Sequence, residues 1–211
     1  FSFARTCQLL WSGSGDGETA PKTESIFQHL AEGRIWAFEH LDKISFLGDT
    51  DDAMLALQSA VALVATEPEN TDSPVDDNLV AAARVTGAAA TIAAAWWRLS
   101  QGREPVAPEA ERGHAADFLR MILGESPDEA AVDALRRYLV TVSDHGLNAS
   151  TFTARVIAST QSSLASAASG AVGALRGPLH GGAPGPVLEM LEDIGEPERA
   201  EDWIRAALEA G

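Results

Sequence analysis

The amino-acid sequence predicts an all-α protein, and three observations lead to this fold class. Nearly every long segment of the 211 residues repeats its apolar side chains with a helical period. Clusters of Gly, Pro, Asp, Ser or Asn separate these segments from one another. Alternating β-branched runs of strand length are scarce. Because 45% of the residues are hydrophobic, the chain can bury a substantial core, and we expect one helical domain over residues 1–211.

The N-terminal half is expected to contain five helices, at residues 3–11, 23–32, 34–42, 49–66 and 78–100. Gly33 is expected to separate the second of these helices from the third. The segments 12–17, rich in Gly and Ser, and 67–77, rich in Pro and acidic residues, are expected to be loops. Three alanine triplets leave the helix at 78–100 almost without bulky side chains, so neighbouring helices are expected to approach it closely.

The C-terminal half adds five expected helices, at residues 114–123, 127–142, 150–175, 186–194 and 198–210. Ser126 is expected to cap the second of these, with Pro127 at its first position. The helix at 150–175 consists mainly of Ala, Ser, Thr and Val with few charges, which indicates burial on most sides. Its neighbours are then either helices of the same chain or, in a symmetric dimer, helices of a partner subunit. We expect a two-fold homodimer that buries this helix.

The charge balance excludes two classes of partner. Fifteen Lys and Arg stand against 31 Asp and Glu, which gives a formal net charge of −16, and no basic cluster interrupts this excess. We therefore expect neither a nucleic acid nor an anionic membrane as a partner, and no segment is expected to span a membrane. The acidity fits either a well-solvated surface or a high-salt host. Cys7 is the only cysteine, so we expect no disulfide and a cytoplasmic location.

Metal and cofactor motifs are not found in the sequence. His29 and His40, with Glu32 and Glu39 nearby, fit no compact ligand motif, so we expect no metal site there. His114 opens an expected helix after a charged loop, which favours capping or simple exposure. The glycines between residues 13 and 17 follow no convincing strand, and a dinucleotide site is therefore not expected.

Two segments each place a histidine on an irregular turn between helices. The first surrounds His145, in residues 143–152, and the second surrounds His180, in residues 177–183. A single histidine at a helix boundary is more often a cap or a satisfied polar group. Glycines flank both histidines, however, and they permit close backbone approach and positive φ angles. In such turns backbone groups and an imidazole can both face a pocket, so each segment is a candidate part of a substrate site.

The two segments closely resemble the citrate synthase family. Its members typically carry a segment like Ser-Asp-His-Gly-Leu-Asn-Ala-Ser-Thr-Phe at 143–152, then a long helix, then a segment like Gly-Pro-Leu-His-Gly-Gly-Ala at 177–183. The likeness continues through residues 154–160 and 173–175, and more weakly upstream at 116–121 and 7–11. The chain therefore resembles the large helical domain of this family over most of its length.

The resemblance implies an acyltransferase of the tricarboxylic acid cycle type, in which an acyl-CoA, most simply acetyl-CoA, condenses with oxaloacetate before the thioester is hydrolysed. His180 is then the catalytic residue that hydrogen-bonds the thioester oxygen, and His145 and Asn148 hold the keto acid. Because the resemblance places both histidines around the same substrates, we expect them at one shallow cleft at the edge of the domain. Coenzyme A enters as part of the substrate, so the resemblance implies no resident cofactor. A neutral imidazole that donates to a developing enolate oxygen lowers the barrier to proton removal without ionising.

Departures from the family leave two other functions open. Members of the family continue with a Gly-x-Gly-His-Arg loop, a proton-abstracting Asp and arginines for oxaloacetate, and none of these can be assigned in residues 1–211. Pro184 stands where an Asn often follows Gly-Gly-Ala, and residues 162–166 lack the Asp and Tyr often seen there. We therefore expect a large domain that is incomplete at both ends relative to the family. The alternatives are a non-catalytic ligand-binding module and a helical dimerisation scaffold.

Overall fold

The computed structural model describes residues 1–12, 22–63, 77–182 and 184–210, and all of its regular elements are helices. The α-helices are α1 (Phe3–Trp11), α2 (Thr23–Glu39), α3 (Ala53–Leu63), α4 (Asp77–Ser100), α5 (His114–Leu123), α6 (Glu129–Val142), α7 (Ala149–Ser159), α8 (Leu164–Leu175), α9 (Pro184–Ile194) and α10 (Ala200–Ala210). Two 3₁₀ helices, η1 (Leu41–Asp49) and η3 (Pro197–Arg199), precede α3 and α10. The predicted all-α class is confirmed. The loop expected at 67–77 and most of the one expected at 12–17 lie outside the described residues.

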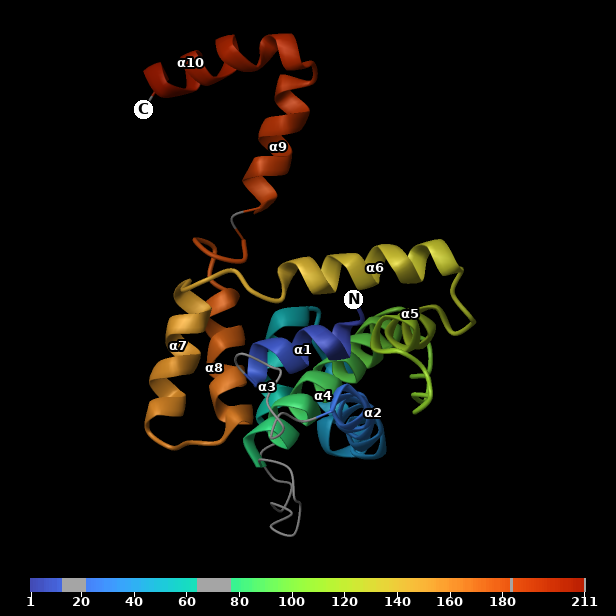
Figure 1. Ribbon diagram of the computed structural model, residues 1–211. Coiled ribbons are helices and arrows are strands. Elements are labelled where there is room, and N and C mark those ends of the chain that lie inside the picture. Colours follow the sequence, from blue (N-terminus) through green and yellow to red (C-terminus); the bar gives the residue numbers. More distant parts are fainter. Residues whose placement is uncertain (13–21, 64–76, 183, 211) are drawn as a thin grey trace.

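Helix α4 is the centre of the body, and α2, α3, α5 and α8 pack around it (Figure 1). Its small side chains form the middle of the main core, where Ala88, Ile92 and Ala95 are almost fully buried. By length and mean hydropathy, residues Asn78–Ser100 are apolar enough to cross a membrane, which differs from the expectation that no segment is. Half of the apolar stretch is buried against the other helices, and this packing accounts for its composition.

Two glycines allow α2 and α4 to cross at close range. A Cβ atom at Gly33 would lie 2.2 Å from the carbonyl oxygen of Arg84, and one at Gly87 would lie 2.1 Å from that of Leu30. The predicted break at Gly33 is therefore wrong, because α2 runs through it without interruption. Glycine is placed here for backbone contact and not for helix termination. The expected close approach to the alanine-rich helix is confirmed.

Replacing Gly33 with alanine is expected to lower the free energy of unfolding by about 1–3 kcal/mol, since a methyl group cannot be accommodated without moving the α4 backbone. Urea unfolding followed by circular dichroism measures this change. Gly113→Ala is the matched control, because no heavy atom lies within 4 Å of its Cβ position. Equal effects of the two substitutions would contradict the assignment of Gly33 to the helix crossing.

A buried ionic network joins α2 to α5 and to the loop before α5. Asp117 and Arg34 are 0% and 1% exposed, and the Arg34 Nε donates to an Asp117 carboxylate oxygen at 2.8 Å. Arg120 donates to the same carboxylate from Nε at 3.1 Å and from Nη2 at 3.0 Å. The amide of Glu109 donates to it as well, at 3.1 Å. Burial lowers the pKa of Arg34, and the charge of Asp117 opposes that shift.

The helix predicted at 150–175 is two helices, α7 and α8, which pack side by side as a hairpin. Gln161 breaks the helix with a φ of 62°, and Ser163 then caps α8 by accepting a hydrogen bond from the amide of Ser166. Residues of α8 pack on α3, but α7 has no buried residue in this chain. The prediction of one continuous helix is therefore wrong, whereas burial of this segment against a partner subunit stays a prediction.

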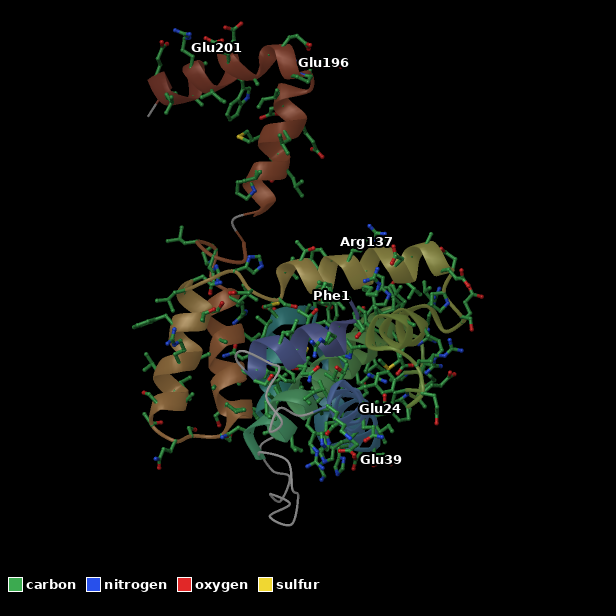
Figure 2. All side chains as sticks on the ribbon, in the orientation of Figure 1. Phe1, Glu24, Glu39, Arg137, Glu196 and Glu201 are labelled. Atoms are coloured by element: carbon green, nitrogen blue, oxygen red, sulfur yellow. The ribbon has the colours of Figure 1, made fainter. Side chains whose placement is uncertain are left out.

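The remaining boundaries follow the sequence with small differences. Asp128, and not Ser126, caps α6, because its carboxylate accepts from the amide of Ala131 at 2.9 Å. Helices α9 and α10 stand apart from the body in Figure 1, and the side chains in Figure 2 show how little of the molecule surrounds them. They leave five apolar side chains exposed: Val187, Leu188, Leu191, Ile204 and Leu208.

Candidate active site

The two histidine turns lie at the same end of the α7–α8 hairpin (Figure 1). A continuous helix of 26 residues would have held them about 39 Å apart, at 1.5 Å per residue. The hairpin reverses the chain instead, so the start of α7 and the end of α8 are neighbours. The break that contradicts the predicted helix is thus the feature that allows the predicted site.

The first turn is organised by two side chains that accept backbone hydrogen bonds. Asp144 accepts from the amide of Gly146 at 2.7 Å, and Gly146 has a φ of 69°, which favours glycine. Asn148 is the N-cap of α7, and its Oδ1 accepts from the amide of Thr151 at 2.9 Å. The turn therefore has a defined backbone, and Asn148 keeps its amide nitrogen available as a donor.

The second turn folds back on the end of α8. The amide of Gly181 donates to the carbonyl of Leu175 at 2.9 Å, and a Cβ at Gly181 would lie 2.2 Å from that oxygen. A Cβ at Gly182 would lie 2.9 Å from Cα of Pro178. Close approach of the backbone, which we expected from the glycines, thus holds in this turn, whereas a positive φ is found only at Gly146 in the first turn.

A hydrogen-bond chain connects the two turns. His180 Nε2 lies 3.0 Å from the hydroxyl oxygen of Ser150, and that hydroxyl lies 2.8 Å from Oδ1 of Asn148. His180 is half-buried. The structure therefore brings together two of the three predicted site residues through Ser150, which we had not singled out. The signal for Ser150 was its position two residues after Asn148 in the same segment.

The third predicted residue, His145, is exposed, and its side chain has no hydrogen bond within the described part of the chain. The same turn carries Leu147, which lines an open hollow of about 340 Å³ on the outer face of α7 together with Phe152, Arg155, Val156 and Ser159. Neither imidazole lines this hollow. One cleft shared by His145 and His180 remains a prediction.

The other histidines lie outside this site. His114 is neither a cap nor simply exposed: it is half-buried, stacks on Phe3 with ring centroids 4.9 Å apart, and lies 3.4 Å from Arg34 through Nδ1. Burial and the charge of Arg34 lower its pKa to about 3, so the ring is neutral. His29 pairs with Glu32, and His40 stacks on Trp36. In the described residues no three His, Cys, Asp or Glu side chains gather as metal ligands.

Known proteins are similar to this chain over almost its whole length. The chain is 43% identical over 210 residues to citrate synthase 2 of Bacillus subtilis, covering 99% of this chain and 56% of that protein. It is 36% identical over 208 residues to 2-methylcitrate synthase of Mycobacterium tuberculosis, covering 98% of this chain and 52% of that protein. The crystal structure of citrate synthase from Thermotoga maritima superposes with a TM-score of 0.78 at 32% identity, over 99% of this chain and 54% of that one.

The chain thus spans about half the length of the curated relatives that it matches. All of its residues, 1–211, match the family described as citrate synthase, C-terminal domain. The solved relative shares both the helical architecture and a third of the sequence, so the resemblance carried by the two histidine turns extends through the whole fold. By profile, by sequence and by structure, this chain belongs to the citrate synthase family.

Proposed function

We propose that this chain forms part of an acyltransferase that condenses an acyl-CoA with oxaloacetate and then hydrolyses the thioester. The observation that carries the proposal is the hydrogen-bond chain from His180 through Ser150 to Asn148, which ties the two turns into one unit. Condensation needs a donor for the thioester oxygen beside groups that hold the keto acid. The His180 turn supplies the donor, and the 144–148 turn supplies the holding groups.

The hydroxyl proton of Ser150 controls which nitrogen of His180 carries a proton. The hydroxyl donates to Asn148 Oδ1, which can only accept, so Nε2–H of a neutral His180 donates to the hydroxyl. When the hydroxyl turns its proton from Oδ1 to Nε2, the ring instead carries its proton on Nδ1. Nδ1–H is then free to donate to the thioester oxygen as enolate charge develops. Ser150 is in this way a positioning residue for His180.

His145 and Asn148 are proposed to hold oxaloacetate. The capping bonds fix Asn148 through its oxygen, so its NH₂ group is oriented as a donor to a carboxylate or keto oxygen. His145 is exposed at the same turn and reaches solvent, where a dianionic keto acid arrives. We propose acetyl-CoA as the first acyl donor. The similarity to both a citrate and a 2-methylcitrate synthase makes propionyl-CoA the comparison substrate in any assay.

His180→Ala, in a protein that joins these residues to the downstream part of the family, is expected to lower kcat by about 10²–10⁴-fold, the usual contribution of a positioned acid or base. Ser150→Ala is expected to lower kcat less, with little change in KM. His29→Ala is the matched control, since this histidine of α2 lies outside the two turns and hydrogen-bonds Glu32. Coenzyme A thiol release measures all three. Full activity of His180→Ala would contradict the assignment of His180 as the catalytic residue.

We also propose a cytoplasmic location, in keeping with a single, buried cysteine. We further propose a homodimer whose interface is formed by α7. The outer face of α7 is exposed, with Phe152 60% accessible and Val156 beside it on the hollow. Light scattering is expected to report a dimer. Phe152→Asp is expected to shift it to a monomer, because a carboxylate on an apolar interface is costly to desolvate. A wild-type monomer would refute the interface.

A further inference from the structure

A second cavity lies away from the histidine turns, under α6, where α1, α2 and α5 meet. Its volume is about 130 Å³. An engineered cavity of roughly 150 Å³ binds benzene, so this slightly smaller space suits a compact body of about six heavy atoms. Most of the wall is apolar, from Phe3, Ala4, Phe27, Leu30, Ala115, Ala116 and Val132. It shares no lining residue with the site proposed above.

The start of α5 brings uncompensated backbone donors to this wall. Gly113, His114, Ala115 and Ala116 all line the cavity. Gly113 provides no side-chain cap, and the first intrahelical bond is donated by the amide of Asp117 to its carbonyl. The amides of the first turn therefore have no acceptor within the helix, and the positive end of the helix dipole lies at the cavity.

His114 lines the same cavity and keeps one ring donor. The guanidinium of Arg34 has only donors, so the Nδ1 of His114, 3.4 Å away, must accept and carries no proton. The neutral ring then carries its proton on Nε2. Nδ1 faces Arg34, and Nε2–H is the remaining polar group that this ring offers to the cavity that it lines. The ring stacks on Phe3, which holds it in place.

The ion-pair sets that line the cavity contain more arginines than carboxylates. Arg34 and Arg136 line the cavity, and each belongs to a set in which arginines outnumber carboxylates. Arg34, Arg112 and Arg120 share Glu109 and Asp117. Arg136 and Arg137 share Asp133. Each set has one positive charge in excess, although the chain carries −16.

We infer that this cavity binds a small monocarboxylate with a compact apolar body, such as an aromatic or branched-chain acid. The apolar wall takes the body. The carboxylate lies toward the first turn of α5, where the amides, the His114 Nε2–H and the excess arginine charge converge. A neutral molecule of the same shape fits the wall but leaves these donors without an anionic acceptor.

Benzoate is the probe, and benzamide is its neutral isostere. Titration of the purified chain, followed by NMR shifts at constant ionic strength set with NaCl, is expected to give saturable benzoate binding at least tenfold tighter than benzamide binding. Arg136→Gln is expected to weaken benzoate binding several-fold and to leave benzamide unchanged. Val132→Phe, which fills the cavity from α6, is expected to remove the binding of both.

Each of the other results overturns the inference. Equal affinities for benzoate and benzamide would remove the anion preference, and a lack of saturation by about 10 mM benzoate, a binding free energy weaker than about −3 kcal/mol, would remove the site. Undiminished binding by Val132→Phe would place the ligand elsewhere. Ala116→Leu fills the cavity from α5 and serves as the second variant if Val132→Phe does not fold, as judged by circular dichroism.

Discussion

Residues 1–211 alone are expected to release coenzyme A from acetyl-CoA and oxaloacetate at least about 10³-fold more slowly than a protein that also carries the downstream part of the family. Condensation requires a base within reach of the acyl methyl group. Two acidic side chains beside the turns are already engaged: Asp144 accepts from the amide of Gly146, and Asp52 pairs with Arg176, next to the second turn, at 2.6 Å. In the roles proposed for them, His180, Asn148 and Ser150 donate or orient, and none removes this proton.

The substrate charge adds to this deficit. Oxaloacetate is a dianion, and it must approach a chain of net charge −16. Arg176 is the arginine beside the second turn, and Asp52 occupies its guanidinium. A coupled thiol assay on the 211-residue chain, run beside the extended protein, measures the difference. Substantial turnover by the short chain would show that a base lies within these residues and would overturn the roles assigned to them.

Asp117→Asn is expected to lower the free energy of unfolding by about 3–5 kcal/mol, because it leaves a buried guanidinium without its carboxylate. Arg34 is 1% exposed, so water cannot replace the lost partner. Arg120 and the amide of Glu109 lose part of their acceptor at the same time. Since domains are stable by only about 5–15 kcal/mol, this single change removes much of the total. Urea unfolding followed by tryptophan fluorescence measures it.

Asp133→Asn is the matched control for this experiment. Asp133 also holds two arginines, Arg136 and Arg137, but on the accessible surface of α6. Solvent screening makes such pairs weak, so no resolvable change in stability is expected. If the two substitutions have equal effects, burial does not determine the strength of the Asp117 network.

The sequence predicted the helices well where periodicity and turn residues agreed. Helices α1 and α5 have their expected bounds, and α4 begins one residue early. Predictions at Gly33 and at residues 150–175 were wrong for opposite reasons. At Gly33 a contact with α4, distant in sequence, overrides the poor helix propensity of glycine. Residues 160–163 contain no Gly or Pro that would predict a turn. The turn depends on Gln161, which adopts a left-handed conformation.

The candidate site was predictable because its residues sit in two short, specific segments. His180 and Asn148 came from those segments directly, and the hydrogen bonds of Ser150 connect them. The second cavity was not predictable, because Arg34 and His114 lie 80 residues apart and no local pattern relates them. Long-range packing decides such pairs, and their positions depend on the whole fold.

The hairpin of α7 and α8 has a consequence for the order in which the molecule assembles. The hydrogen bond that joins the two turns, between His180 and Ser150, forms between residues 30 positions apart, within one antiparallel helix pair. Closing so short a loop costs little chain entropy compared with pairing Arg34 to Asp117 across 83 residues. The end of the hairpin that carries the two histidine turns is therefore expected to form early in folding.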